Sequence, residues 1–338
     1  MKPHDALTEI ASLLERERSS RYKSKAFRSA ADAISSLSDD ELRDAASLRR
    51  RKGVGDSTFA VIQEALAGEV PAYLADLRER AGAERPSTLR GRLRGDLHSH
   101  SDWSDGLTSI DLMVDAARAL GHSYLALTDH SPRLRVANGL TAERLREQLL
   151  LHPGFSDPGP PGEGFTLLSG IEVDILDAGE LDQEPELLDE LDIVVASAHS
   201  KLRMERGPMT RRLVAAASNP LVDVLGHVTG RLVEGSRGTR PPSSFEPKPV
   251  FDACAAHGVA VEINSRPERQ DPPDELIELA LEVGCLFSID SDAHAPGQLS
   301  LIDYGAERAE RLGVPAERIV TTWPLARLRE WTSLRKLG

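Results

Sequence analysis

The feature that most constrains the fold of this chain is a short apolar run that recurs seven times and ends each time in polar residues suited to an active site. The seven ends lie at residues 95–100, 127–130, 169–172, 195–199, 224–227, 261–264 and 289–294. Six of the ten histidines lie at these ends. Alternate side chains of a strand share one face, so His98 and His100 point the same way, as do Asp292 and His294. Each pair can hold one ion from one edge of a sheet.

The segments between these runs are long enough for crossover helices, which we expect at 107–120, 209–218, 249–257 and 273–283. Alternating strands and helices predict parallel strands, and the right-handed crossover rule closes such strands into a barrel. In these barrels the functional groups gather at the carboxyl ends of the strands. The sequence therefore predicts an α/β barrel that brings widely separated histidines and carboxylates to one end.

The segments 96–101, 104–106, 128–130, 170–172, 197–200, 226–227 and 291–294 resemble the successive motifs of the polymerase and histidinol phosphatase (PHP) domain. The similarity runs from about residue 93 to the C-terminus. It is closest to the PHP domain at the C-terminal end of bacterial family X DNA polymerases, on the segments 209–212, 226–232 and 262–269. This resemblance implies a distorted seven-stranded (βα)7 TIM-like barrel over residues 93–338.

The same resemblance implies a metal cluster in which all nine ligand positions are filled. The first ion would be held by His98, His100, Glu172 and Asp292; the second by Glu172, His199 and His227; and the third by Asp105, His130 and His294. Imidazole and carboxylate ligands suit zinc, manganese or iron, and we expect two to three such divalent ions. Closely spaced divalent ions activate water and stabilise phosphoryl oxygens, which favours hydrolysis of a phosphoester substrate.

Three residues are candidates for a direct part in catalysis. Glu172 would bridge two ions. Asp129 directly precedes a ligand, and it could orient a metal-bound imidazole or cap a strand end. Arg269 could clamp a substrate phosphate, because a guanidinium matches phosphate oxygens, or it could be a solvated surface charge.

Residues 1–85 form a separate all-α domain in this interpretation, joined to the barrel by a linker at 86–92. Apolar residues at spacings of three and four predict helices at 6–17, 24–37, 38–46 and 57–67. A basic run at 49–52 leads into Gly53-Val54-Gly55, a turn that resembles a helix-hairpin-helix motif. In that motif glycines let the backbone approach a DNA phosphate near the start of a helix.

Segments 22–31 and 62–68, together with this turn, resemble the N-terminal eight-kilodalton domain of family X polymerases. The resemblance implies DNA binding through Lys23, Arg28, Gly53 and Gly55. Val61 occupies the position of the family's lyase lysine, which argues against Schiff-base chemistry there. Between residues 81 and 93 there is no room for a nucleotidyltransferase domain, so we expect no DNA synthesis.

Charge separates the two parts of the chain. Residues 1–92 carry 17 Lys+Arg and 15 Asp+Glu, a net charge of +2, whereas the remaining residues carry 24 and 39, a net charge of −15. An acidic barrel does not attract nucleic acid over a broad surface. DNA affinity is therefore expected in residues 1–85.

The sequence has no apolar run of membrane-spanning length and no secretory signal pattern, so we expect a cytoplasmic protein. The leading hypothesis is a phosphoesterase acting at DNA ends in repair, as a 3′–5′ exonuclease or a 3′-phosphatase. One alternative is a small-molecule phosphatase of the histidinol-phosphatase type with a docking helical domain. Another is a non-catalytic module that binds DNA ends. An amidohydrolase is less consistent, because no lysine lies at a strand end to bridge the metals.

Overall fold

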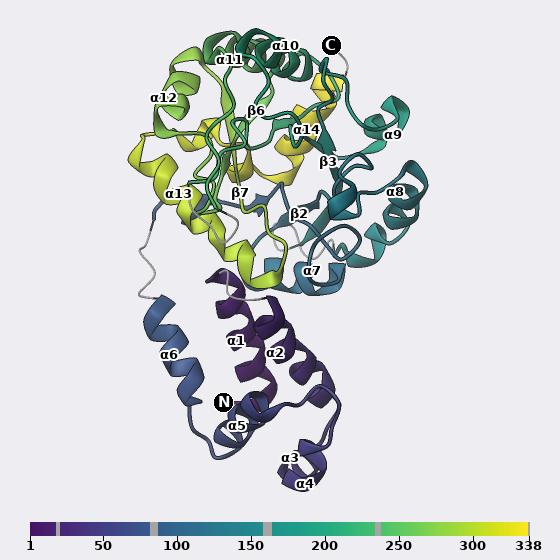
Figure 1. Cartoon of the computed structure of the whole chain (residues 1–338), viewed down its shortest axis with the longest axis vertical. Coiled ribbons are helices and arrows are strands. Elements are labelled where there is room, and N and C mark those ends of the chain that lie inside the picture. Colours follow the sequence, from purple (N-terminus) through teal and green to yellow (C-terminus); the bar gives the residue numbers. More distant parts are fainter. Residues whose placement is uncertain (18–20, 82–86, 158–163, 234–237, 337–338) are drawn as a thin grey trace. The chain divides into compact units, whose positions relative to one another are not determined.

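The computed structural model describes residues 1–17, 21–81, 87–157, 164–233 and 238–336 (Figure 1). The chain divides into two compact units. Residues 1–85 with 295–298 form the first, which we call the helical unit, and residues 86–294 with 299–338 form the second, the barrel unit.

The barrel unit is built on seven parallel strands paired in chain order. They are β1 Gly95–Asp96, β2 Tyr124–Leu127, β3 Thr166–Asp174, β4 Ile193–Ser197, β5 Val224–Leu225, β6 Ala260–Asn264 and β7 Leu286–Asp290. A parallel bridge between Ser99 and Ala293 joins the segments that follow β1 and β7, so the sheet nearly closes on itself. The predicted seven-stranded α/β barrel is confirmed.

Helices lie around these strands (Figure 1). They are α7 Ile110–Ala119, α8 Ala142–Leu149, α9 Pro185–Glu190, α10 Arg206–Ala217, α11 Pro247–His257, α12 Asp274–Val283, α13 Ile302–Arg311 and α14 Leu325–Lys336. Four of them, α7, α10, α11 and α12, occupy the segments where the sequence predicts crossover helices. The strands are buried on both faces, which is why each reads as a continuous apolar run instead of an alternating one.

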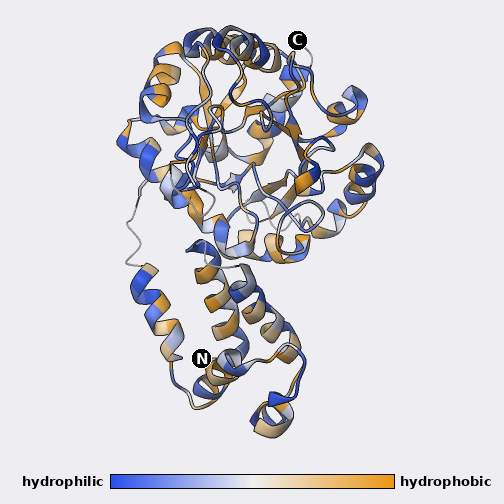
Figure 2. Cartoon of the chain, viewed as in Figure 1, coloured by the Kyte–Doolittle hydropathy of each residue, from blue (hydrophilic) through white to orange (hydrophobic). Residues whose placement is uncertain are grey.

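The helical unit contains α1 Pro3–Arg16, α2 Arg21–Ile34, α3 Asp39–Arg43, α4 Ala45–Arg49, α5 Asp56–Leu66 and α6 Ala72–Ala81. Its helices carry both hydrophobic and hydrophilic residues (Figure 2), and the apolar ones form a core of their own around Leu7, Ile10, Phe27 and Ile62.

The helix predicted at 38–46 is two helices in the structure. Ser38 caps α3 in a capping box with Glu41, and the Asp44 side chain accepts a hydrogen bond from Ser47 N and so starts α4. Two caps six residues apart divide the segment, and α6 was not predicted at all. Within the described part of the chain, no helix is both long and apolar enough to cross a membrane.

Candidate metal centre

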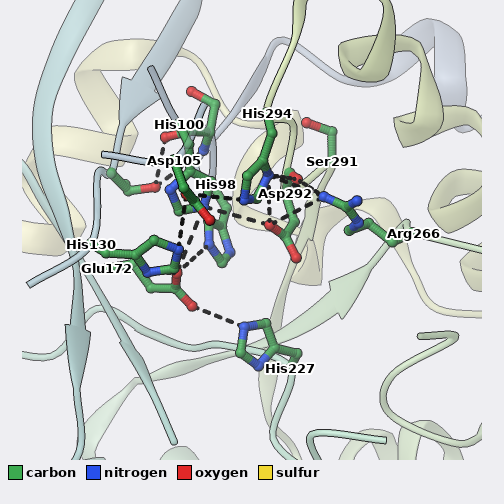
Figure 3. A network of polar contacts seen from close by, with 12 residues as sticks. His98, His100, Asp105, His130, Glu172, His227, Arg266, Ser291, Asp292 and His294 are labelled. Atoms are coloured by element: carbon green, nitrogen blue, oxygen red, sulfur yellow. Dashed lines mark hydrogen bonds and ion pairs between the residues drawn. The ribbon is translucent and has the colours of Figure 1, made fainter. Parts of the chain in front are cut away.

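The carboxyl ends of the barrel strands bring all nine predicted ligands to one site. Figure 3 labels all of them except His199. His98, His100 and Asp105 follow β1; His130 follows β2; His199 follows β4; His227 follows β5; and Asp292 and His294 follow β7. Glu172 is placed differently from the others, because it lies inside β3. That strand pairs with β2 over its first half and with β4 over its second half, and so runs two residues beyond Glu172.

Glu172 is the hub of the site. Its side chain is 1% exposed, and it lies among five imidazoles. The distances from its carboxylate oxygens are 2.8 Å to His130 Nδ1, 2.9 Å to His227 Nε2, 3.1 Å to His199 Nε2, 3.4 Å to His98 Nε2 and 3.7 Å to His100 Nε2. A carboxylate in this position can bind more than one cation at once.

Two further carboxylates complete the cluster. Asp105 Oδ1 lies 3.4 Å from both His130 Nε2 and His294 Nε2. Asp292 Oδ1 lies 3.5 Å from His100 Nε2 and 3.6 Å from His294 Nδ1. The Asp105 side chain is 37% exposed, whereas that of Asp292 is 2% exposed, so the cluster opens to solvent on the Asp105 side.

The nine residues fall into four overlapping groups whose ligand atoms lie within 4.8 Å of one another. The groups are His98–His100–Asp292, His98–Glu172–His227, His130–Glu172–His199 and His100–Asp105–His130–His294. These groups divide the ligands differently from the family pattern, in which His130 belongs with Asp105 and His294 alone. The cluster gathers the residues predicted from the sequence, while their roles as metal ligands and their division among individual ions stay predictions.

The donor set fits divalent cations. Within the described residues, several buried atoms of the cluster make no well-oriented hydrogen bond: His98 Nε2, both ring nitrogens of His100 and of His199, His130 Nδ1, His227 Nδ1 and Glu172 Oε2, although His130 Nδ1 and Glu172 Oε2 lie 2.8 Å apart. Buried polar atoms without partners are unfavourable, and so many in one place indicate a missing common partner. Imidazole nitrogen and carboxylate oxygen are ligands for zinc, manganese and iron. The site therefore supports binding of several divalent metal ions.

The electrostatics of the cluster favour the ligand forms of Glu172 and His100. Burial lowers the pKa of His98, His130 and His199, but the attraction of the Glu172 carboxylate outweighs it and raises the pKa of all three. Burial would raise the pKa of Glu172, but the imidazoles of His199, His98 and His130 lower it well below its ordinary value. Burial lowers the pKa of His100 to about 3, and the neighbouring histidines act in the same direction. An ionised bridging carboxylate and a neutral imidazole are the forms that bind metals.

Two buried acids hold ligands without being predicted ligands themselves. Asp174 Oδ1 accepts a hydrogen bond from His199 N at 3.0 Å. Glu262 Oε1 lies 2.6 Å from His98 Nδ1. Residues 261–264 form one of the seven predicted strand ends, where no role is predicted for Glu262. An acid within an otherwise apolar strand is the sequence signal that could have identified it.

Asp129 is placed differently from the expectation that it orients an imidazole. Its carboxylate accepts hydrogen bonds from Ser101 N at 2.8 Å, Ser101 Oγ at 2.6 Å, Ser104 Oγ at 2.5 Å and Gln148 Nε2 at 2.7 Å. Its four donors all come from the segment 101–104 and from α8. Asp129 therefore anchors the loop that carries Asp105.

Arg269 lies at the edge of the cluster and is not a solvated surface charge. Its Nε is 3.1 Å from Asp292 Oδ2, and its side chain is 18% exposed. Arg266 approaches the same residue, because its Nη1 donates to the Asp292 carbonyl at 2.8 Å. Two guanidinium groups therefore stand beside Asp292, a predicted ligand.

In the helical unit, the four predicted DNA-binding residues have different surroundings. Gly53 has φ +96°, and a Cβ at this position would lie 2.9 Å from Ser29 O, so the turn requires glycine. Gly55 is the N-cap of α5, and Lys23 is exposed.

Arg28 differs from the expectation of a DNA contact. Its Nε and Nη2 each lie 2.6 Å from an oxygen of Glu15, and the two side chains are only 11% and 2% exposed. A buried, bidentate ion pair of this kind holds α2 against α1. Arg28 is therefore a structural residue of the helical unit and does not project toward a ligand.

Comparison with known proteins agrees with this geometry. Residues 96–266 match the PHP domain family, and residues 2–70 match a helix-hairpin-helix domain. A DNA polymerase/3′-5′ exonuclease PolX from Bacillus subtilis is 38% identical over 225 residues, which are 65% of this chain and 38% of that protein. A probable phosphatase from Vibrio parahaemolyticus is 29% identical over 217 residues, 61% of this chain and 80% of that protein.

Among solved structures, a histidinol phosphate phosphatase from Lactococcus lactis aligns with 65% of this chain and 94% of its own, with a TM-score of 0.46 and 17% identity. The chain spans well under half the length of its PolX relative. The PHP match covers half of the chain and includes most of the metal cluster. The chain therefore belongs to the PHP domain family of phosphoesterases and carries a helix-hairpin-helix domain at its N-terminal end.

Proposed function

We propose that this chain hydrolyses phosphoester bonds at DNA ends, as a 3′–5′ exonuclease or a 3′-phosphatase. The observation that carries the proposal is the presence, in one chain, of a nine-ligand cluster and a helix-hairpin-helix domain. The similarity to PolX, a DNA polymerase/3′-5′ exonuclease, supports the same choice of substrate. DNA synthesis is not proposed, because the segment between α6 and β1 is too short for a nucleotidyltransferase domain.

The proposed chemistry uses the cluster and its edge. His98, His100, Asp105, His130, Glu172, His199, His227, Asp292 and His294 would hold two to three divalent ions. When bound, such ions supply an activated water and stabilise the oxygens of a phosphoryl group. Arg269 gives its Nε–H to Asp292, and the other N–H groups of its guanidinium are candidates for a phosphate oxygen.

The helical unit supplies the reason to prefer DNA over a small phosphoester. Lys23 and the run 49–52 are exposed, and residues 1–92 are net positive while the rest of the chain is strongly negative. Basic residues next to a glycine turn can contact backbone phosphates without reading sequence. With Arg28 paired to Glu15, this role rests on Lys23, the run 49–52 and the turn.

A small-molecule phosphatase is the second candidate. The Vibrio relative is named a probable phosphatase, and the alignment covers 80% of its length. A small phosphomonoester would need only the metal cluster, and the helical unit would then dock another protein.

The experiment compares substrates and charge-reversal variants of the full chain. Metal-supplemented protein is assayed on a 3′-hydroxyl oligonucleotide, 3′-phosphorylated DNA, histidinol phosphate and a small chromogenic phosphoester. We expect Lys23→Glu combined with Lys52→Glu to reduce DNA hydrolysis at least about tenfold and to flatten its salt dependence, because fewer counterions are released. Hydrolysis of the chromogenic ester should stay unchanged.

Lys248→Glu is the matched control, because Lys248 is an exposed lysine of the barrel unit that pairs only weakly with Asp252 across one helical turn. It should leave DNA hydrolysis near the wild-type rate. Efficient turnover of histidinol phosphate with none of DNA would overturn the proposal in favour of the small-molecule phosphatase.

A further inference from the structure

Strand β6 supplies none of the nine predicted ligands, yet two of its side chains reach into the cluster. Glu262 and Asn264 are 0% and 1% exposed. They stand two positions apart on one strand and therefore on the same face of the barrel wall. Buried polar groups need hydrogen-bond partners, and the partners of these two side chains include three of the predicted metal ligands.

Glu262 contacts two ligands with its two oxygens. Oε1 lies 2.6 Å from His98 Nδ1, and Oε2 accepts a hydrogen bond from His227 N at 2.5 Å. Because a carboxylate only accepts, the proton of the His98 ring belongs on Nδ1. The lone pair of His98 is then left on Nε2, the nitrogen that faces Glu172 at 3.4 Å.

Asn264 extends the same arrangement to a third ligand. Its Nδ2 donates to Asp292 Oδ2 at 3.1 Å and to Glu262 Oε2 at 3.2 Å. Its Oδ1 accepts a hydrogen bond from Arg266 N at 3.1 Å. Both polar ends of this amide are therefore used, which fixes its orientation.

We propose that Glu262 and Asn264 are positioning residues that brace the metal centre from β6. They hold ligands carried by the ends of three other strands: His98 after β1, His227 after β5 and Asp292 after β7. In the family pattern these three ligands belong to two different ions, so one brace sets the geometry of both. This inference rests on the metal centre of the proposed function, but not on DNA as the substrate.

Glutamine cannot make both contacts that the Glu262 carboxylate makes. Glutamine keeps one acceptor and turns the other oxygen into an NH₂ donor. Whichever way the amide turns, a donor then faces either His98 Nδ1 or His227 N. A donor facing Nδ1 moves the imidazole proton to Nε2, which removes the lone pair that a metal needs.

The experiment measures metal affinity directly in Glu262→Gln, with no use of catalysis. Each protein is loaded with cobalt(II), its visible absorption spectrum is recorded, and the ions are titrated out with a chelator. Removing a residue that hydrogen-bonds to a metal ligand, without binding the metal itself, weakens metal binding about 10- to 100-fold. We expect Glu262→Gln to lose cobalt affinity by a factor in this range and to change the cobalt spectrum. Asn264→Ala removes the contact to Asp292, together with those to Glu262 and Arg266, but leaves Glu262 in contact with His98 and His227, so it should give a smaller loss in the same direction. If Glu262→Gln does not fold, the cobalt affinity and spectrum of Asn264→Ala test the inference in its place.

Asp223→Asn is the matched control. Asp223 is also a barrel carboxylate with 0% exposure, and it also accepts a backbone N–H, from Val194 at 2.9 Å. It directly precedes β5 and pairs with Arg335, so it stands at the amino end of the strands. This variant should keep wild-type cobalt affinity and spectrum.

Wild-type affinity and spectrum in folded Glu262→Gln would overturn the inference, as would an equal loss of cobalt in Asp223→Asn. A wild-type chain that binds no cobalt, zinc, manganese or iron would instead overturn the proposed function itself.

Discussion

Replacing Asp129 separates two roles for this residue, as a loop anchor and as a catalytic group. The structure gives its carboxylate four donors: Ser101 N, Ser101 Oγ, Ser104 Oγ and Gln148 Nε2. Both serines belong to the segment that leads directly to Asp105. If Asp129 is an anchor, its replacement should loosen this segment and weaken the part of the cluster that contains Asp105.

The expected losses follow from what each substitution leaves behind. Asp129→Ala leaves the buried Ser101 N–H and the Gln148 amide without acceptors, at about 1–3 kcal/mol each, with a smaller loss from the two hydroxyls. The expected decrease in the free energy of unfolding is about 3–6 kcal/mol.

Asp129→Asn should cost less. Gln148 Oε1 has no partner within the described residues, so its amide can turn and accept from the new NH₂ group. The weaker neutral bonds are partly offset, because the buried charge is removed; burial already raises the pKa of Asp129, although the serine donors lower it. We expect a decrease of about 1–2 kcal/mol.

Urea unfolding and elemental analysis of the two variants test this reasoning. Both should lose metal from the Asp105–His130–His294 site, with Asp129→Ala losing more, and metal added in excess should restore much of the hydrolysis by Asp129→Asn. Unchanged stability and full metal content combined with abolished hydrolysis in Asp129→Asn would refute the anchor role and point to a direct part in catalysis.

Three further predictions concern other parts of the chain. Gly53→Ala should destabilise the helical unit by about 1–3 kcal/mol, because φ is +96° and the added Cβ would lie 2.9 Å from Ser29 O, whereas Gly55→Ala, with open space around it, should cost about 1 kcal/mol or less in urea unfolding. Borohydride should trap no covalent adduct with DNA bearing a 5′ abasic end, because Val61 is a buried apolar residue and cannot form an imine; a stoichiometric adduct would contradict this. Burial lowers the pKa of both His122 and His152 to about 4, with Arg90 adding to the shift at His122. The unfolded chain therefore binds more protons below about pH 6.5, and each histidine should remove up to about 1.4 kcal/mol of stability per pH unit as the pH falls from about 6.5 to 4. Replacing both by glutamine should make unfolding free energy less dependent on pH in that range, and an unchanged pH profile would show that they do not control it.

The barrel and the gathering of its histidines and carboxylates could be predicted because both leave local marks in the sequence. Each buried parallel strand appears as an apolar run, and His98, His130 or His227 marks the point where such a run ends. The position of Glu172 inside β3 could not be predicted in the same way. The length of that strand depends on its pairing with β2 on one side and β4 on the other.

The roles that the sequence did not predict depend on partners far along the chain. Arg28 appears as a basic residue suited to DNA until Glu15, on another helix, is seen to pair with it. Asp129 adjoins a ligand but is held by serines and by Gln148 of α8. Glu262 is an acid in an apolar strand, and only the closed barrel places it against His98, which precedes it by 164 residues.

The most direct test of the metal-dependent phosphoesterase is elemental analysis of the wild-type chain and Glu172→Ala, followed by hydrolysis assays on the same samples. The account predicts two to three divalent ions per wild-type chain, phosphoester hydrolysis that a chelator removes, and a variant that loses metal and hydrolysis together because Glu172 lies among five imidazoles. Glu172→Ala with full metal content and full hydrolysis would contradict it.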